Sequence, residues 1–252
     1  MVKSHVLFKF EYKELNKMNI GIDGFLDNWC VCFIDSKNQL TIRTCNDIEN
    51  IMHFLNDESR IFIDIPIGLS SKSIQRKIDQ KLREKLPKGK KSSVFNAPCR
   101  KAVRANNYIQ AKEINKKILH KSISIQSWNI TNKIKEVDEF LIKNKNKQLN
   151  IHESHPEFCF INLNNGVPLK NNKKTKQGMN ERVFILKKFI KNTEDILEKN
   201  YHQYKNENIK RDDILDAISL ALSVKKWSEN GKRKITQYPK YDEKGLPFEI
   251  YY

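Results

Sequence analysis

The sequence predicts an α/β fold in which a mixed β-sheet carries a basic helical insertion. Two observations predict this class. Between residues 18 and 68, short apolar runs bounded by turn residues surround a single stretch of helical periodicity. Residues 70–147 differ, because apolar residues recur there among many lysines and strand signals are few. The expected core order is therefore strand, strand, strand, helix, strand, as in an α/β protein with one sheet.

The first part of the chain supplies the elements of this core. Residues 19–23 form a short apolar run, and residues 29–35 and 39–45 are β-rich runs separated by a hairpin-like break. Helical periodicity follows over residues 47–56. Residues 60–64 are apolar without alternation, which is typical of a strand buried on both faces, as in a parallel sheet.

The second part of the chain extends this core beyond the insertion. Residues 149–153 predict a fifth strand, and residues 180–191 and 212–227 predict helices. The chain is accordingly divided into an N-terminal extension (1–17), one domain that includes the insertion (18–227), and a polar, peripheral C-terminal tail (228–252).

Composition excludes several classes of protein. No window approaches 18 consecutive apolar residues, which argues against a transmembrane helix. The first ten residues lack the features of a secretory signal. The 5 cysteines contain no CxxC pair, so neither a disulfide framework nor a zinc ribbon fits. We therefore expect a soluble, cytoplasmic protein with no membrane partner; its oligomeric state is left open.

The positive charge is concentrated in one part of the chain. The formal net charge is +17, and residues 69–150 hold 21 basic and 6 acidic residues, a local charge of +15. A lysine bias of the whole sequence would spread this charge more evenly. A concentrated positive field attracts polyanions, so we expect a nucleic-acid partner, either DNA or RNA. The alternative is a solvated helical surface.

Two aspartates lie at the ends of predicted strands. Asp23 ends the first strand, and Asp64 ends the strand at 60–64. A right-handed crossover through the intervening helix would make these strands parallel neighbours, about 4.8 Å apart. The two carboxylates would then stand side by side and repel each other unless a cation lies between them. A turn residue is the alternative interpretation of Asp23.

A second pair of aspartates lies on the predicted helix at 212–227. Asp213 and Asp216 are three residues apart and share one face, and Ala217 would let this helix approach the sheet closely. Asp212 is interpreted as the helix N-cap, and the helix dipole alone would favour Asp213 in the first turn. Asp216 lies beyond that turn on a mostly apolar helix, where a charge is costly unless it is paired or metal-bound.

Together the four carboxylates suit divalent cations. Carboxylate oxygens select hard ions such as Mg²⁺ or Mn²⁺. Two such ions can activate a water molecule and stabilise the leaving oxygen of a phosphodiester. The sequence therefore predicts Mg²⁺ or Mn²⁺, with two ions, as the cofactor.

The strand order and these aspartates resemble the ribonuclease H-like fold. The Asp213-x-x-Asp216-Ala217 pattern is similar to that of RuvC-type Holliday-junction resolvases, which typically carry Glu where this chain has Asp64. More specifically, the chain resembles the predicted-nuclease family called domain of unknown function 429. The segments that carry this resemblance run in order from about residue 20 to 227: Gly21-Ile-Asp23-Gly24 with Trp29, Asp64-Ile-Pro-Ile-Gly68, Ser93-Val-Phe95 with Pro98 and Arg100, Gln126-Ser-Trp128, Glu136-Val-Asp138, Glu153-Ser-His155-Pro156-Glu157, Lys173-Lys-Thr-Lys176-Gln-Gly178 with Glu181-Arg182, and Asp212-Asp-Ile-Leu-Asp216-Ala217.

The resemblance implies roles for particular residues. Asp23, Asp64, Asp213 and Asp216 would be the catalytic metal ligands, Glu153 a further catalytic carboxylate, and His155 and Glu157 residues of the same cleft. Nucleic acid would contact Arg100, Trp128, Lys173, Lys174, Lys176 and Arg182. Several of these contacts have an alternative: a structural salt bridge for Arg100, core packing for Trp128 and a solvated loop for the lysines. His155 is either a proton shuttle or an anchor of the turn before Pro156.

These features lead to one expected function and two rivals. The expectation is metal-dependent hydrolysis of phosphodiester bonds in nucleic acid, with the insertion contacting phosphates. A non-catalytic nucleic-acid-binding module that retains the fold is the first rival. A nucleotide-handling enzyme related to actin and the sugar kinases is the second, although such enzymes need two copies of the fold.

Overall fold

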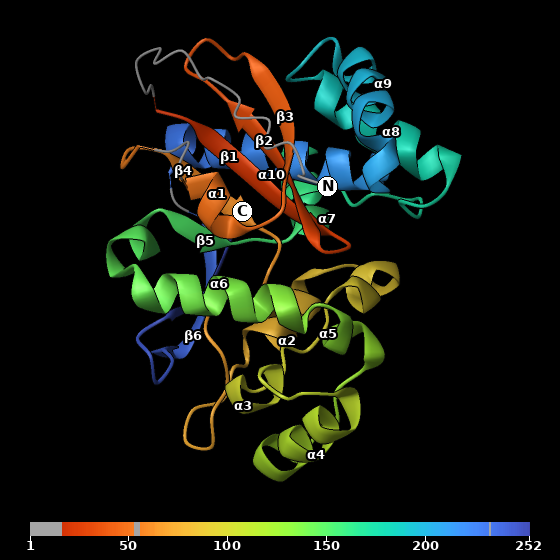
Figure 1. The fold of residues 1–252 in the computed structure, drawn as a ribbon. Coiled ribbons are helices and arrows are strands. Elements are labelled where there is room, and N and C mark those ends of the chain that lie inside the picture. Colours follow the sequence, from red (N-terminus) through yellow and green to blue (C-terminus); the bar gives the residue numbers. More distant parts are fainter. Residues whose placement is uncertain (1–16, 53–55, 232) are drawn as a thin grey trace, which may run out of the picture.

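The computed structural model describes residues 17–52, 56–231 and 233–252 of the chain. Apart from residue 17, the predicted N-terminal extension lies outside this part. The sheet has the strand order β3-β2-β1-β4-β5. These strands span β1 Asn19–Phe25, β2 Asn28–Ile34, β3 Leu40–Cys45, β4 Arg60–Ile63 and β5 Ile151–Glu153. Along the chain, three strands, a helix and a fourth strand follow one another, so the predicted order of elements in the α/β core is confirmed (Figure 1).

Strand directions place the ends of β1, β4 and β5 at one edge. β1, β2 and β3 pair antiparallel, whereas β4 is parallel to both β1 and β5. The register pairs Ile22 with Ile63 and Ile63 with Glu153. The helix that connects β3 to β4 is α1, Ile48–Met52. The predicted parallel pairing of the strands before Asp23 and Asp64 is thus confirmed.

Helices cover both faces of the sheet. On one face, Ile20 and Ile22 of β1 pack with α1 and with Ile134 of α6 (Thr131–Lys143). On the other face lies α10 (Arg211–Asn230), which follows β1 closely. A Cβ atom on Gly21 would lie 2.1 Å from the Ala217 carbonyl oxygen. Glycine at this position therefore lets α10 come against β1, and the close approach predicted from Ala217 is confirmed.

The segment between β4 and β5 is a helical lobe. It contains α2 Ile78–Lys85, η1 Lys88–Ser93, α3 Arg100–Val103, α4 Tyr108–Leu119, α5 Ile125–Asn129, α6 and η2 Lys145–Leu149. Figure 1 shows α3 and α4 at the end of the molecule away from α8 and α9. Cys99, Ala102, Ala111 and Ile123 form a small apolar core within the lobe. The helical character predicted for residues 70–147 is confirmed.

The remaining helices are more numerous than predicted. They are α7 Pro156–Leu163, α8 Lys176–Lys187, α9 Thr193–Tyr204 and η3 Lys205–Glu207. α8 begins earlier than the predicted residue 180, because the Thr175 hydroxyl accepts a hydrogen bond from the Gly178 amide (3.0 Å) and caps the helix. None of the described helices combines the length and apolarity needed to span a bilayer.

The prediction of a peripheral tail over residues 228–252 is wrong. α10 extends to Asn230, and a hairpin of β6 (Lys234–Tyr241) and β7 (Pro247–Tyr251) follows it. Phe248 and Ile250 are buried, and Tyr251 packs with Phe62 of the sheet. The overall polarity of this segment hides an apolar alternation at Phe248 and Ile250, which is the pattern of a strand with one buried face.

Candidate functional site

Four aspartates meet at the edge of the sheet where β1 and β4 end. Asp23 lies in β1, and the amide of Asp64, directly after β4, donates a hydrogen bond to the Ile22 carbonyl (3.0 Å). Gly21 faces α10, and the two-residue period of a strand puts Asp23 on the same side. Asp213 and Asp216 come from the first two turns of α10. Three separate segments therefore bring carboxylates to one place.

The carboxylates act on one another electrostatically. Burial raises the pKa of Asp23 well above its usual value, and the charges of Asp216 and Asp64 raise it further. Burial also raises the pKa of Asp64 to about 7, with Asp216 adding to the effect, and the pKa of Asp213 to about 6. Such like-charged neighbours are stable as anions only beside positive charge.

Lys173 supplies positive charge to this cluster. Its Nζ lies 2.7 Å from Oδ2 of Asp216 and 3.7 Å from Oδ2 of Asp212. Burial raises the pKa of Asp216, while the Lys173 ammonium lowers it, and Asp216 in turn raises the pKa of Lys173. The sequence predicts Lys173 as a phosphate contact and gives no sign of this ion pair, because a loop-to-helix contact over 43 positions has no periodicity.

Asp212 is not the N-cap of α10, contrary to the sequence interpretation. The helix begins at Arg211 and Lys210 occupies the N-cap position. Asp213 is the residue that stabilises this end, since its Oδ2 accepts a hydrogen bond from the Lys210 amide (2.8 Å). The N-cap therefore lies two residues earlier than the sequence interpretation gives it, and Asp212 and Asp213 both fall in the first turn of the helix.

The cluster has the donor chemistry of a divalent-cation site without a preassembled geometry. Carboxylates suit Mg²⁺ or Mn²⁺, and their mutual repulsion would be relieved by such an ion. Within the described ranges, however, no three His, Cys, Asp or Glu side chains converge as a metal-binding group. The nearest cation to Asp216 is the Lys173 ammonium. The residues therefore fit these ions by charge and ligand type, and binding would require the carboxylates to draw together.

Two adjoining cavities open beside the carboxylates. The first, of about 420 Å³, is lined by Asp23, Asp64 and Asp213. The second, of about 770 Å³, is lined by Asp64, Asp212 and Asp216. Residues shared by both cavities are Asp64, Ser93, Phe95, His155 and Lys173. The cavities thus form one cleft between the sheet edge and the helical lobe, with the carboxylates at its base.

Glu153 reaches the first cavity, but its carboxylate is engaged by other groups. Oε2 accepts hydrogen bonds from Arg76 Nη1 (2.9 Å) and from the Ile67 amide (2.7 Å). Ile151 of the same strand packs on the α6 side, and two-residue periodicity puts Glu153 on that side too, opposite to Asp23. The structure therefore does not bring Glu153 into the aspartate cluster.

His155 and Glu157 both line the cleft, as the sequence predicts. His155 precedes α7, its Nε2 lies 3.4 Å from the Ser93 hydroxyl, and burial lowers its pKa. Its role as proton shuttle or turn anchor stays a prediction. Glu157 pairs with Arg182, which is 0% exposed and also donates to the Gly178 carbonyl (3.0 Å). Complete burial removes Arg182 from any contact with phosphate in this structure.

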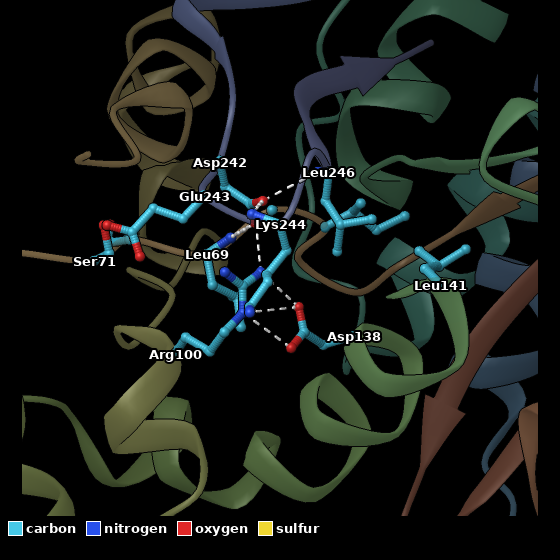
Figure 2. A network of polar contacts seen from close by, with 12 residues as sticks. Leu69, Ser71, Arg100, Asp138, Leu141, Asp242, Glu243, Lys244 and Leu246 are labelled. Carbon is cyan, nitrogen blue, oxygen red and sulfur yellow. Dashed lines mark hydrogen bonds and ion pairs between the residues drawn. The ribbon is translucent and has the colours of Figure 1, made fainter. Parts of the chain in front are cut away.

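Arg100 and Trp128 line neither of the two cavities beside the clustered aspartates. Arg100 joins two segments, because its guanidinium pairs with Asp138 of α6 (2.8 Å) and with Asp242 after β6 (Figure 2). This geometry matches the structural salt bridge that was the alternative for Arg100. Trp128 packs against the small lobe core beside Tyr108, with ring centroids 6.2 Å apart. Of the remaining predicted contacts, Lys174 lines the second cavity, whereas Lys176 is exposed at the start of α8 and lines neither cavity.

Comparison with known families identifies the chain. A family model described as "protein of unknown function (DUF429)" matches residues 21–242. The chain belongs to this family. The DUF429 match begins in β1 and ends just after β6, so it includes all four clustered aspartates, the helical lobe and the first strand of the hairpin. Searches of curated proteins and of solved structures returned no match.

Replacing Asp64 by Asn should change how stability depends on pH. A carboxyl whose pKa is raised in the folded chain, here to about 7, favours folding at low pH. This contribution is lost as the pH rises from about 4 to about 7. In EDTA, the Asp64→Asn variant should therefore gain about 2–3 kcal/mol relative to wild type between about pH 5 and pH 8. Urea unfolding measures the difference, and a pH-independent difference would contradict this electrostatic description.

Proposed function

We propose that the protein is a divalent-metal-dependent nuclease with a ribonuclease H-like fold, similar to RuvC-type enzymes. The observation that carries the proposal is the convergence of Asp23, Asp64, Asp213 and Asp216 at one sheet edge, at the base of a cleft. Ligands of parallel α/β sheets commonly bind at the carboxyl ends of the strands. The strand order, with two parallel strands added to an antiparallel hairpin sheet, also supports the fold assignment.

Each aspartate would contribute in a way that its element determines. Asp23 and Asp64 are fixed by paired strands and would hold the ions on a rigid base, while Asp213 and Asp216 would complete the site from α10. When bound, Mg²⁺ or Mn²⁺ would polarise the phosphodiester and activate water. Lys173 pairs with Asp216 here. If a divalent cation were bound by Asp216 instead, the Lys173 ammonium would be free to contact a phosphate oxygen.

The second cavity provides the electrostatic conditions for a polyanion. Lys90, Lys170, Lys173 and Lys174 line it. Lys90 belongs to the basic insertion, and its Nζ donates to the Asn171 carbonyl (2.7 Å) across the cleft. A phosphate backbone passing here would lie beside the carboxylates at the cleft base. Of these four lysines, Lys90 comes from residues 69–150, the segment with the local charge of +15.

A cleavage assay tests the proposal. Wild type and Asp23→Asn would be incubated with single strands, duplexes, RNA–DNA hybrids and four-way junctions, with Mg²⁺ or Mn²⁺ and with EDTA. We expect metal-dependent cleavage by wild type that is lost in Asp23→Asn, because Asp23 is buried and its charge interacts with those of Asp216, Asp64 and Asp213. The matched control is Asp195→Asn, which changes an exposed aspartate on α9.

The outcomes test the site assignment and separate the nuclease from the non-catalytic binding module. Cleavage that is equal in wild type and Asp23→Asn would contradict the assignment of the site. Salt-dependent binding of nucleic acid without turnover on any substrate would favour the non-catalytic binding module.

A further inference from the structure

We propose that the cleft recognises unpaired nucleic acid and that Phe95 stacks on one of its bases. This inference rests on the proposed function in one respect, that nucleic acid is what enters the cleft. It adds a specificity-determining residue and a substrate class, a single-stranded segment, which the aspartate cluster alone does not indicate.

Phe95 is an exposed aromatic side chain in an unusual place. Its side chain is 40% exposed, and it lines both cavities beside Asp64 and Lys173. Most aromatic rings of a folded chain bury their faces, so a ring left open above a charged cleft is available to a ligand. In the part of the chain that the structure describes, Phe95 and Leu26 are the two exposed large apolar residues that line either cavity.

The backbone around Phe95 is fixed on both sides. The carbonyl of Val94 accepts from Arg83 Nε (3.3 Å), and the amide of Ala97 donates to Asp79 Oδ2 (3.0 Å). Arg83 also donates to the Asn96 side chain. Val94 and Ala97 are themselves buried. The ring is therefore presented by an anchored segment, which lowers the entropy lost when a ligand binds.

Leu26 gives the first cavity a second apolar wall. It lies at the tip of the turn between β1 and β2, is 66% exposed, and has φ of 43°, a conformation that is costly for a branched side chain. Backbone strain of this kind concentrates at functional sites. Leu26 and Phe95 thus offer apolar surface at the cavity that contains Asp23. Two lysines, Lys133 and Lys173, also line this cavity, whereas the second cavity has four, Lys90, Lys170, Lys173 and Lys174.

The cleft therefore combines surfaces that suit the two chemical parts of a nucleotide. The lysines, which are more numerous in the second cavity, suit phosphates, and the ring of Phe95, which lines both cavities, suits the face of a base. Cavities of about 420 and 770 Å³ have the size of sites that hold one small ligand. A base inside a duplex stacks on its neighbours and cannot offer its face to Phe95, so the occupant is an unpaired strand.

A binding cycle tests the stacking contact directly. Fluorescence anisotropy in EDTA, which prevents metal-dependent cleavage, would compare wild type and Phe95→Ala on a labelled single strand and on the same strand made abasic. The abasic strand keeps every phosphate and loses the bases. We expect Phe95→Ala to bind the intact strand about 5- to 150-fold more weakly. Binding of the abasic strand should be equal for both proteins.

The controls keep the result specific. Phe184→Ala removes a ring that is 66% exposed on α8 and lines neither cavity, so its affinity should equal that of wild type. The duplex of the same sequence should bind more weakly than the single strand. Unchanged affinity of Phe95→Ala for the intact strand would overturn the proposal, as would an equal loss on both strands, no binding by wild type, or a preference for duplex.

The binding cycle and the cleavage assay together separate this inference from the proposed function. In one outcome, Phe95→Ala weakens binding of the intact strand alone while wild type cleaves no substrate with metal. That result would support the recognition of single strands and contradict the nuclease activity. If wild type cleaves nucleic acid while Phe95→Ala leaves affinity for the intact strand unchanged, the nuclease stands and the stacking contact is wrong.

Discussion

Replacing Asp216 with Asn should reduce metal-dependent cleavage by more than about a hundredfold. Loss of a group that merely orients a metal ligand costs 10- to 100-fold, and loss of a ligand costs more. Asp216 is 2% exposed and interacts with both Asp23 and Asp64. It lies after the first turn of α10, so capping of the helix does not explain its presence. Asn keeps the shape of the side chain and removes its charge. Cleavage rates under single-turnover conditions measure the effect.

Binding distinguishes this loss from misfolding. Removing a negative charge from the lysine-lined cavity should leave the affinity for nucleic acid unchanged or make it tighter. The control Asp195→Asn, on exposed α9, should cleave as wild type does. Normal cleavage by Asp216→Asn, or a parallel loss of binding and folding, would contradict the role of Asp216 in holding a cation.

Replacing Arg182 with Met should destabilise the protein by about 3–5 kcal/mol. Arg182 is completely buried, pairs with Glu157 and lies over the ring of Phe160, with 5.3 Å from its guanidinium carbon to the ring centroid. Met fills similar volume but removes the closer of two cations from Glu157, which is 8% exposed, and leaves it only Lys90, whose Nζ lies 3.7 Å from Oε2. Breaking a buried pair by removing one member has this cost because the remaining buried charge loses its hydrogen-bonded partner. Urea unfolding measures the change.

A second variant separates the charge from the volume. Arg182→Met combined with Glu157→Met removes both charges, and it should recover most of the lost stability, since apolar replacement of a whole buried pair is often neutral. The exposed ion pair of Lys187 with Glu194 provides the control, because Lys187→Met should cost less than about 1 kcal/mol. A loss below about 1 kcal/mol for Arg182→Met alone would contradict the importance of the Glu157 pair.

The sequence predicts the sheet and the aspartate cluster because both depend on local patterns. Continuous apolarity at residues 60–64 indicates a buried parallel strand, and this places Asp64 beside Asp23. The three-residue spacing of Asp213 and Asp216 puts them on one helix face whatever the rest of the chain does. Gly21, which lets α10 approach, is visible in the sequence only once the helix over it is known.

The sequence does not reveal which charged side chains form ion pairs with each other. Arg100, Arg182 and Glu153 are equally plausible as ligand contacts or as members of ion pairs, and the structure gives each an internal partner. Those partners lie 38, 25 and 77 positions away in the chain. No periodicity encodes such distances. The orientation of Glu153 is an exception, because it follows from the two-residue period of a strand. Since Ile151 of β5 faces the α6 side, Glu153 faces that side too.

The C-terminal hairpin shows a different limit. Average polarity marks residues 228–252 as peripheral, yet Asp242 of this segment is 5% exposed and accepts from the Leu69 amide (2.9 Å). It also pairs with Arg100. A short strand with one buried face needs few apolar residues, so composition averaged over 25 residues conceals it.

The most direct test of the central claim is calorimetric titration of Mn²⁺ into wild type and Asp23→Asn. It needs no substrate, so it examines the aspartate cluster independently of the choice of nucleic acid. We predict saturable Mn²⁺ binding by wild type, with one or two ions for each chain, that is lost in Asp23→Asn and kept in Asp195→Asn. Absence of binding to wild type, or equal binding by Asp23→Asn, would contradict a cation site formed by Asp23, Asp64, Asp213 and Asp216.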